Sequence, residues 1–563
     1  MTRLARSSQR SVKAVSGRPA PSRLRKLVVP PIAPSDAAPL IEFRPSLSAY
    51  LRQRLTAFSD GFRHNVAVLG QAGSGKSTLL QQTLHASDAR VTKITCEVQR
   101  ESVRDFIRRF ATAVLRGALD APAGASFGEL MERAASPLPK TAAAVEQLER
   151  YANGHLQAEA FAHALDIVPV VHQELGRPCV LVLDEFLRLE DLGLSHAFHE
   201  LGKRVMTWPF TLFILSSSSV ARAQEIIRER LHLLFGQFEV ITLGPVETPA
   251  TLAWMRQELP SPSLPRFLLH WAGMSPWYLA VLLKRLKELT LLKQERSPAS
   301  SVLAQAAWDT LGSPDGALYQ WCAGQVERIV QQRHGPVARE ALIHLALGAR
   351  TTQAVAQHSG TRQNLSLALQ MLSEADLIQR KGACWVIPDQ VFACWLSAVL
   401  APTFQRGLRD QAALAAIFEQ TMHDLWVQWE RAMAEPLAAR IERLLSAFRN
   451  ETVSLDHKTG RLLHFRRLVP QPSPRAGEAY LIADGDERRW CCLIAEGRIE
   501  EAQVAGFEEF CRSQLPRPSR KVVIARDGLE LNATLLAKEA SMWVWQPEDV
   551  NLLALLYGQP PLA

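Results

Sequence analysis

The sequence lacks the features that mark several classes of protein. Its eight cysteines form no Cys-x-x-Cys pair and no Cys/His spacing of the zinc-site kind, so we interpret them as reduced thiols. No stretch reaches the roughly 18 uncharged apolar residues that cross a bilayer, and no apolar core of a secretory signal follows the N-terminus. These absences predict a non-secreted, cytoplasmic protein with no membrane partner.

Negative charge is missing from the first 35 residues, which contain eight Lys and Arg but no Asp or Glu. Since the formal net charge of the chain is +8, the remainder carries equal numbers of both signs. A segment rich in Arg, Ser and Pro is typical of a disordered basic arm that touches polyanions, and also of an organelle transit peptide. We favour a basic arm over residues 1–40 and keep the transit peptide as the alternative.

The chain has 563 residues, of which 47 % are hydrophobic and 21 % charged, so it can bury the cores of several domains. Short apolar runs bounded by polar residues predict buried strands, and the segments between them have helical patterns. Strands that alternate with helices indicate a parallel α/β sheet. The predicted strands are residues 65–69, 90–95, 179–183, 211–215 and 238–243.

The first of these strands leads into Gly70-Gln-Ala-Gly73-Ser-Gly75-Lys76-Ser77, which matches the P-loop pattern G-x-x-x-x-G-K-[ST]. The glycines let successive backbone N–H groups turn into one concavity, which together with the positive helix N-terminus holds phosphates. Lys76 is expected to reach the β- and γ-phosphates, and the Ser77 hydroxyl to bind Mg²⁺. The predicted nucleotide contacts are Gly70, Gln71, Ala72, Gly73, Ser74, Gly75, Lys76, Ser77 and Thr78.

A second anchor for magnesium follows the strand at residues 179–183, which ends in two carboxylates. Asp184 is expected to hold Mg²⁺, while Glu185 polarises the attacking water as general base. The strand at residues 211–215 runs into four consecutive serines. Ser216 and Ser218 are candidates to contact the γ-phosphate or its water, although four serines are equally typical of a turn.

Residues 43–289 resemble the archaeal-type ATPases of the AAA+ and STAND group, through the P-loop, Leu183-Asp-Glu-Phe186 and Gly273-Met-Ser-Pro276-Trp-Tyr278-Leu279. The resemblance implies a P-loop NTPase sheet with a helical lid, binding ATP and Mg²⁺. Two arginines of the family pattern are replaced here, by Trp277 in the lid and by Gln237 after the fourth strand. Such arginines stabilise charge on the γ-phosphate, so we expect ATP binding with slow hydrolysis.

Residues 352–387 read as helix, tight Gly turn, helix and hairpin, which is the winged helix-turn-helix order. Thr361 is a good N-cap, which would put Arg362, Gln363 and Asn364 where a recognition helix meets the major groove. Arg380 and Lys381 would lie on the wing and meet phosphate. The alternative is a packing or protein-binding module. The resembled family has this domain in the same place, ending in a Phe-x-x-Trp element like Val391-Phe392-Ala-Cys-Trp395.

The last hundred residues resemble a restriction-endonuclease-like domain whose metal-binding residues are replaced. Where the pattern has Glu-x-Asp and Glu-x-Lys, this chain has Glu478-Ala-Tyr480 and Glu496-Gly-Arg498. Asp484 cannot substitute if Ala483 and Arg489 flank a hairpin turn, because Glu496 would then lie roughly 23 Å away along the strand. We therefore expect no nuclease activity, with phosphate affinity through Arg498 and the basic residues 517–521.

The predicted fold is α/β, with a basic arm (1–40), an ATPase core (41–245), a helical lid (246–300), a winged helix (301–400), a helical connector (401–460) and a nuclease-like domain (461–563). The first functional hypothesis is an ATPase that acts as a DNA-associated nucleotide switch. The second is a STAND-type signalling or scaffold ATPase whose winged helix only packs or binds protein, as a homo-oligomer or with a protein partner. The third is an active ATP-dependent nuclease.

Overall fold

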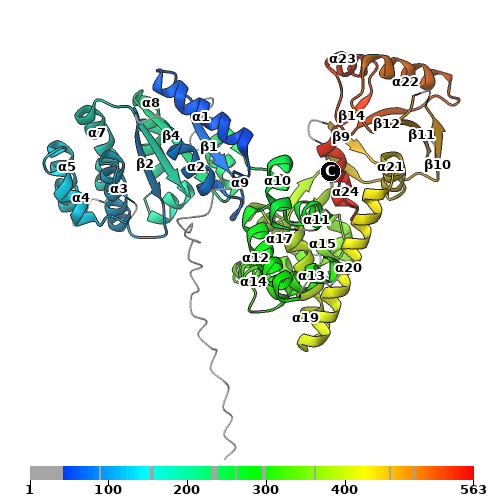
Figure 1. The fold of residues 1–563 in the computed structure, drawn as a ribbon, viewed down its shortest axis with the longest axis horizontal. Coiled ribbons are helices and arrows are strands. Elements are labelled where there is room, and N and C mark those ends of the chain that lie inside the picture. The colour runs from blue at the N-terminus through cyan, green and yellow to red at the C-terminus, as the bar shows by residue number, and fades with distance from the viewer. Residues whose placement is uncertain are drawn as a thin grey trace, which may run out of the picture. The chain divides into compact units, whose positions relative to one another are not determined.

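The computed structural model describes residues 42–563 apart from 88–89, 123, 153–156, 195, 230–237, 260, 262, 294–298, 360–362, 456–457, 474, 487 and 563. The chain divides into two units, residues 1–41 and 42–563. The basic arm predicted for residues 1–40 lies outside the described residues. Along the second unit an α/β module is followed by a helical block and then by a second α/β module (Figure 1).

The N-terminal module is built on a parallel five-stranded sheet, which confirms the predicted α/β fold. The strand order is β2-β3-β4-β1-β5, so β4 lies between the strand that precedes the P-loop and the strand that ends in Asp184. The second strand begins two residues later than predicted. The bounds are β1 (Asn65–Leu69), β2 (Thr92–Glu97), β3 (Cys179–Asp184), β4 (Thr211–Ser217) and β5 (Phe238–Thr242).

Helices cover both faces of this sheet because successive strand residues point to opposite sides. Val66 and Val68 of β1 pack with α1 (Pro45–Ser59) and α2 (Lys76–His85), while Ala67 and Leu69 face the other layer. That layer contains α3 (Val103–Ala118), α4 (Phe127–Ala134), α5 (Pro139–Ala152), α6 (Gln157–Leu165), α7 (Ile167–Leu175) and α8 (Ala197–Thr207). After β4 the chain enters α9 (Val220–Glu229).

The helical block shares one hydrophobic core that extends from Val246 to Trp429. The helical connector predicted over residues 401–460 is divided in the structure, since Gly407 has φ +63° and Pro436 precedes the last helix. The helices are α10 (Thr248–Glu258), α11 (Ser263–Ala272), α12 (Pro276–Lys293), α13 (Ala299–Ala307), α14 (Ala317–Val330), α15 (Gly335–Ala346), α16 (Thr352–Ser359), α17 (Leu365–Glu374), α18 (Gln390–Trp395), α19 (Ala401–Gln405) and α20 (Gln411–Ala434). The next helix, α21 (Leu437–Ser446), packs instead into the core of the second α/β module.

Within this block, α15, α16 and α17 are followed by the two-stranded hairpin β6 (Gln379–Lys381) and β7 (Cys384–Val386). We call residues 335–387 the helix–hairpin module. Its elements occur in the order that the sequence predicts, and Leu365, Leu369 and Leu372 are buried on one face of α17. The hairpin turn packs against the next module, because the Ala383 amide donates a 2.8 Å hydrogen bond to the Thr452 carbonyl.

The C-terminal α/β module contains a mixed sheet in the order β10-β11-β12-β13-β14. Asp484 pairs with Arg489 and Ala483 pairs with Trp490. The hairpin turn therefore lies where the sequence predicts it, but it is one residue shorter than the turn expected between Ala483 and Arg489. β8 (Thr452–Leu455) and β9 (Lys458–Arg461) form a separate hairpin at the end of the segment predicted as a helical connector. The remaining elements are β10 (Arg467–Pro472), β11 (Glu478–Asp484), β12 (Arg489–Ala495), α22 (Glu501–Ser513), β13 (Arg520–Ala525), α23 (Leu531–Glu539), β14 (Trp543–Trp545) and α24 (Pro547–Leu556).

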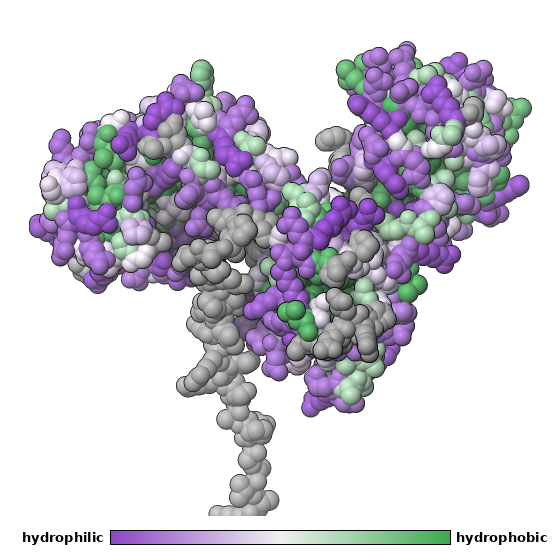
Figure 2. Space-filling model, viewed as in Figure 1, coloured by the Kyte–Doolittle hydropathy of each residue, from purple (hydrophilic) through white to green (hydrophobic). Residues whose placement is uncertain are grey.

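The surface of the molecule is mainly hydrophilic in the view of Figure 2, and its hydrophobic residues occur in small separate patches. Among the described residues, no helix combines the length and apolar character needed to cross a membrane. All eight cysteines are free and buried.

Candidate nucleotide-binding site

The predicted P-loop connects β1 to α2, and its backbone requires glycine at two positions. Gly73 has φ +79° and Gly75 has φ +86°, a region that residues with a Cβ rarely adopt. Gly75 is also the N-cap of α2. Among the described residues, the amides of Gly75, Lys76 and Ser77 donate to no backbone carbonyl, as is usual at a helix N-terminus. These amides are free to bind an anion such as a phosphate.

Lys76 is buried at the start of α2, with only 6 % of its side chain exposed. Its Nζ donates hydrogen bonds to the carbonyls of Gly70, at 2.7 Å, and Gln71, at 3.2 Å. Glu185 Oε1 lies 4.0 Å from the same nitrogen. Burial lowers the pKa of Lys76, while the carboxylates of Glu185 and Asp184 oppose this shift. The ammonium is therefore held inside the loop by two backbone carbonyls, with the Glu185 carboxylate beside it.

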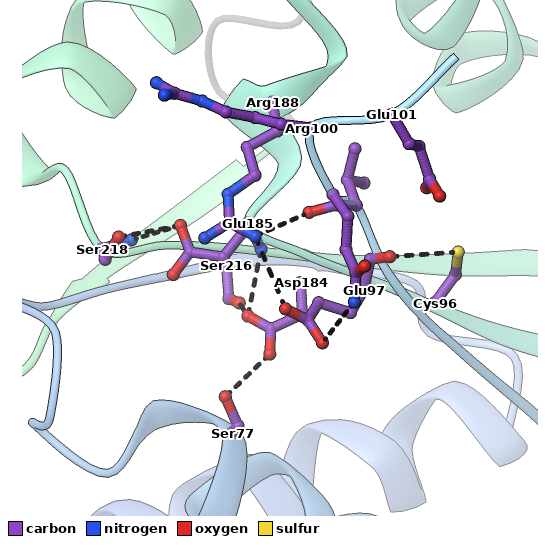
Figure 3. Close-up of polar contacts among 12 residues, drawn as sticks. Ser77, Cys96, Glu97, Arg100, Glu101, Asp184, Glu185, Arg188, Ser216 and Ser218 are labelled. Carbon is purple, nitrogen blue, oxygen red and sulfur yellow. Dashed lines mark hydrogen bonds and ion pairs between the residues drawn. The ribbon is translucent and has the colours of Figure 1, made fainter. Parts of the chain in front are cut away.

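Ser77 and Asp184, the two residues expected to bind Mg²⁺, contact each other directly (Figure 3). Ser77 Oγ donates a 2.7 Å hydrogen bond to Asp184 Oδ2, and the Ser216 hydroxyl donates to Asp184 Oδ1. The parallel order β3-β4-β1 brings these three side chains to one edge of the sheet although they are far apart in the sequence. A hydroxyl and a carboxylate are suitable oxygen ligands for Mg²⁺, so the donor set fits this ion.

Glu185 follows Asp184 in a left-handed backbone conformation, with φ +54°. Such strain in a residue other than Gly costs about 1–3 kcal/mol and is concentrated at functional sites. The carboxylate accepts hydrogen bonds from the Ser218 amide, at 3.1 Å, and from Ser218 Oγ, at 2.9 Å, both at Oε2 (Figure 3). Ser216 and Ser218, which we expected to contact phosphate or its water, thus bind the two carboxylates instead.

Three residues that sequence analysis did not assign also contribute to this site. Arg44, which precedes α1, donates 2.7 Å hydrogen bonds to the carbonyls of Ser74 and Gly244. Arg188 lies near enough to lower the pKa of Lys76. The third residue is Asp376, whose carbonyl accepts a hydrogen bond from Gln71 of the P-loop. The sequence could have indicated Arg188, because it follows Glu185 by three residues. Nothing in the sequence indicated Arg44, which lies 30 residues before its P-loop partner Ser74.

The lid sequence predicted to approach the nucleotide lies directly on the P-loop. Ser275 Oγ donates a 2.8 Å hydrogen bond to the Gly73 carbonyl. A Cβ built on Gly73 would lie 3.7 Å from Trp277, so the side chain that replaces the family's arginine lies beside the loop. The second replacement, Gln237, lies outside the described residues, as does the preceding segment 234–236.

The helix–hairpin module contacts the same edge of the sheet through Asp376. Gln71 Nε2 of the P-loop donates a 2.9 Å hydrogen bond to the Asp376 carbonyl. The Asp376 carboxylate accepts hydrogen bonds from the amides of Val220, at 2.7 Å, and Ala221, at 3.2 Å, at the start of α9. One residue of the module therefore touches both the phosphate-binding loop and the segment after the serine-bearing strand.

The residues predicted to contact DNA are not arranged as the sequence suggests. The helix begins at Leu365, and Asn364 precedes it as N-cap with φ +63°, so Gln363 and Asn364 lie in an exposed turn before the helix instead of on it. Thr361 and Arg362 lie outside the described residues. Arg380 is exposed on β6, next to Lys381, and its Nε donates to the Gly382 carbonyl at 3.1 Å.

The candidate nuclease residues are engaged in other contacts. Glu496 accepts a hydrogen bond from the Leu437 amide and forms a 3.1 Å ion pair with Arg526. Tyr480 is buried against the rings of Phe507 and Phe510. Among the described residues, no group of three or more His, Cys, Asp or Glu side chains is arranged to hold a metal ion.

Residues 44–213 match the AAA ATPase domain family. A Walker-type ATPase of Pyrococcus abyssi is 14 % identical, over 63 % of this chain and 96 % of its own, with a TM-score of 0.46. The Aeropyrum pernix ORC1 protein, solved in complex with DNA, is 14 % identical over 65 % of this chain and 94 % of its own, with a TM-score of 0.34. The Thermotoga maritima RuvB Holliday junction branch migration motor is 12 % identical over 63 % of this chain and 97 % of its own, with a TM-score of 0.32. No curated protein matches the sequence.

Proposed function

We propose that this protein binds ATP with Mg²⁺, hydrolyses it slowly, and acts as a DNA-associated nucleotide switch. The observation that carries the proposal is the meeting of Lys76, Ser77, Asp184 and Glu185 at one edge of the parallel sheet. Each of these side chains has the chemistry that its position requires in a P-loop ATPase. The match of residues 44–213 to the AAA ATPase domain supports the nucleotide-binding part.

In this proposal the free amides of residues 75–77 and the Lys76 ammonium bind the phosphates. Ser77 and Asp184 hold the magnesium ion, which supplies charge neutralisation on the phosphate oxygens when it is bound. Ser216 orients Asp184 through the hydrogen bond at Oδ1. Gly70 must stay small, because a Cβ there would lie 2.9 Å from both Leu243 and Ser74.

Hydrolysis requires a base near the γ-phosphate, and Glu185 is our candidate. Its carboxylate takes a proton from the attacking water while the water oxygen bonds to the γ-phosphorus. The bond from that phosphorus to the β–γ bridging oxygen breaks, and ADP leaves with phosphate as the second product. Ser218 acts as a positioning residue, since its amide and hydroxyl both donate to Glu185 Oε2.

We expect turnover to be slow because Trp277 contributes no positive charge where the resembled family has an arginine. A guanidinium that stabilises charge on the γ-phosphate can be worth several powers of ten in rate. Arg188 is the described cation that could partly replace it, but it forms a 3.5 Å ion pair with Glu97.

The contact made by Asp376 is our candidate for the switch. It joins Gln71, next to the phosphate-binding glycines, to the start of α9, which follows Ser216 and Ser218. A movement of the P-loop on nucleotide binding would therefore act directly on the helix–hairpin module. DNA contact is proposed for Arg362, Gln363, Asn364, Arg380 and Lys381, of which Gln363, Asn364 and Arg380 are exposed in the described part of the chain.

The test is to measure ATP affinity and turnover with and without duplex DNA, in the wild type and in Asp376→Ala. We expect DNA to change turnover in the wild type and to have no effect in the variant. Asp410→Ala is the matched control, because Asp410 also accepts from a helix N-terminal amide, that of Ala412 in α20, without touching the P-loop. Duplex DNA that is not retained at moderate salt would refute the DNA-associated part of the proposal.

A scaffold ATPase of the STAND type is the second candidate, and the packing of the hairpin turn favours it. A Cβ on Gly382 would lie 2.6 Å from the Thr452 carbonyl oxygen, so this turn is in close contact with β8. A wing that packs in this way has less surface for DNA. Light scattering distinguishes the two candidates: assembly that depends on ATP, without DNA retention, is the result expected for the scaffold.

A further inference from the structure

The C-terminal α/β module carries a surface depression of about 320 Å³ that the proposed function does not use. It lies where β9, the start of β13 and the start of β14 meet. This volume is about ten times the roughly 30 Å³ that one water molecule occupies. Its polar lining residues are Lys458, Thr459, Ser519, Arg520 and Ser541, with Trp543 beside them. The described lining contains no carboxylate.

Arg520 is held rigidly in this depression by two indole rings. Its guanidinium carbon lies 4.9 Å from the ring centroid of Trp490 and 4.5 Å from that of Trp543. Gly460 of β9 closes over it, because a Cβ there would lie 2.9 Å from Arg520 Nη1 and 2.4 Å from Trp543. A guanidinium fixed in this way loses little side-chain entropy when it binds a ligand.

Among the described residues, the Arg520 guanidinium forms no hydrogen bond and no ion pair. Its Nη1 atom is buried and has no hydrogen-bond partner there. A buried donor without a partner is costly, which favours a ligand that can accept from this side chain. Burial and the nearby Arg488 both lower the pKa of Arg520, and no acidic group of the described residues opposes them. The described charge nearest to Arg520 is therefore positive.

We propose that this depression binds a phosphate group. Arg520 supplies a fork of donors that matches two phosphate oxygens, Lys458 supplies a second charge, and the hydroxyls of Thr459 and Ser541 supply further donors. Lys521, which the sequence places in the same basic stretch, instead donates to Glu508 at 2.5 Å. The source that we favour is a phosphodiester of DNA, and in that respect the inference rests on the proposed function.

The site is tested first with inorganic phosphate, through the ³¹P line width, in the Lys76→Ala background that removes phosphate binding by the P-loop. Line broadening is expected, and both Arg520→Gln and Lys458→Gln should abolish it. Arg520→Gln could loosen the packing of the two indole rings. Lys458 is exposed, so Lys458→Gln removes a charge from the site without disturbing that packing. Arg475→Gln is the matched control, an exposed arginine in the same module outside the depression, and should leave the broadening unchanged. Absence of broadening, or its persistence in both variants, overturns the site.

Whether the phosphate belongs to DNA is tested by measuring duplex DNA binding as a function of salt. This experiment uses protein that retains Lys76. Each lost phosphate contact should reduce the slope of log K against log salt by about 0.9. Suppose that Arg520→Gln and Lys458→Gln lose phosphate binding but leave the salt slope of DNA binding unchanged. The site then does not bind the DNA backbone, and its ligand is a free phosphate compound. If the wild type binds phosphate at this site but no DNA, the proposed DNA association fails while the phosphate site stands.

Discussion

The phenol of Tyr278 in α12 donates a 2.7 Å hydrogen bond to the carboxylate of Asp389, and both side chains are buried. Asp389 also caps α18 by accepting from the Phe392 amide at 3.0 Å. Burial raises the pKa of both groups. This pair links the lid, whose Ser275 touches the P-loop, to the segment that follows the helix–hairpin module. The two regions are thus tied by a polar contact within one hydrophobic core.

Tyr278→Phe should therefore destabilise the protein by about 1.5–3 kcal/mol, the range for a hydrogen bond to a charged group, because Asp389 loses a buried partner. Urea unfolding measures the change. Tyr319→Phe is the control, since no hydrogen bond of the Tyr319 hydroxyl is found within the described residues and its loss should cost little. Equal stability of both variants would mean that the Tyr278 hydrogen bond contributes nothing.

Lys76→Ala and Glu185→Gln should have different effects on the ATPase. The first removes the charge that faces the phosphates and should weaken ATP binding by at least about tenfold. The second keeps the shape of the side chain and removes only the base, so ATP affinity is retained while turnover falls by about 10²–10⁴. Equilibrium binding and phosphate release measure the two quantities. Unchanged ATP affinity in Lys76→Ala would contradict the P-loop assignment.

Ser218→Ala tests whether Ser218 positions Glu185. Loss of the hydroxyl leaves only the amide hydrogen bond to Oε2, and a misplaced base can cost up to about 100-fold in rate. We expect kcat to fall with little change in ATP affinity, and Ser218→Thr to restore it. A rise in KM with unchanged kcat would instead indicate that Ser218 contacts the nucleotide, which was the expectation from sequence.

His270 in α11 makes stability depend on pH. Burial, with a smaller contribution from Arg440, lowers its pKa to about 4, whereas an unfolded His has a pKa of about 6.5. Between these values the unfolded chain binds the proton and the folded chain does not, so protonation favours unfolding and stability falls as the pH decreases. The pKa difference predicts a loss of about 2 kcal/mol from this residue between pH 7.5 and pH 5.

His270→Phe should remove this dependence, and within the described part of the chain His270 Nδ1 has no hydrogen-bond partner that the substitution would lose. The variant should therefore gain about 2 kcal/mol relative to wild type on moving from pH 7.5 to pH 5. Urea unfolding at the two pH values measures this difference. If the difference in unfolding free energy between the two proteins is the same at both pH values, the folded and unfolded states bind the proton equally. Folding would then not lower the pKa of His270.

The C-terminal module should not cleave DNA. Tyr480 provides a buried phenol where the resembled pattern has an acid, and Glu496 is already paired with Arg526. An arginine such as Arg498 keeps its proton at neutral pH, so it cannot act as a base. Incubation with single- and double-stranded DNA, Mn²⁺ and ATP should leave both intact. Metal-dependent cleavage that disappears in Glu496→Ala would overturn this prediction.

The sequence alone predicted the P-loop, the carboxylates after β3 and the parallel sheet that joins them. These features depend on local patterns, an apolar run followed by glycines or acids, and on the rule that parallel strands end at one edge. The place of the β11–β12 turn was also predictable, but its register was not, because Asp484 pairs with Arg489 where the sequence had suggested Ala483. The start of α17 was not predictable, because several residues before it could cap a helix. In the structure Asn364 is the N-cap and the helix begins at Leu365.

Only the tertiary structure revealed which groups meet from distant parts of the chain. Ser218 binds Glu185 across two neighbouring strands, Asp376 reaches a P-loop residue 305 positions away, and Arg520 lies between two tryptophans contributed by different strands. No periodicity encodes these pairs, since each depends on how separately folded elements pack. The chemistry of the phosphate-binding loop is thus local in the sequence, whereas the groups that orient its base and connect it to the rest of the protein are determined by packing.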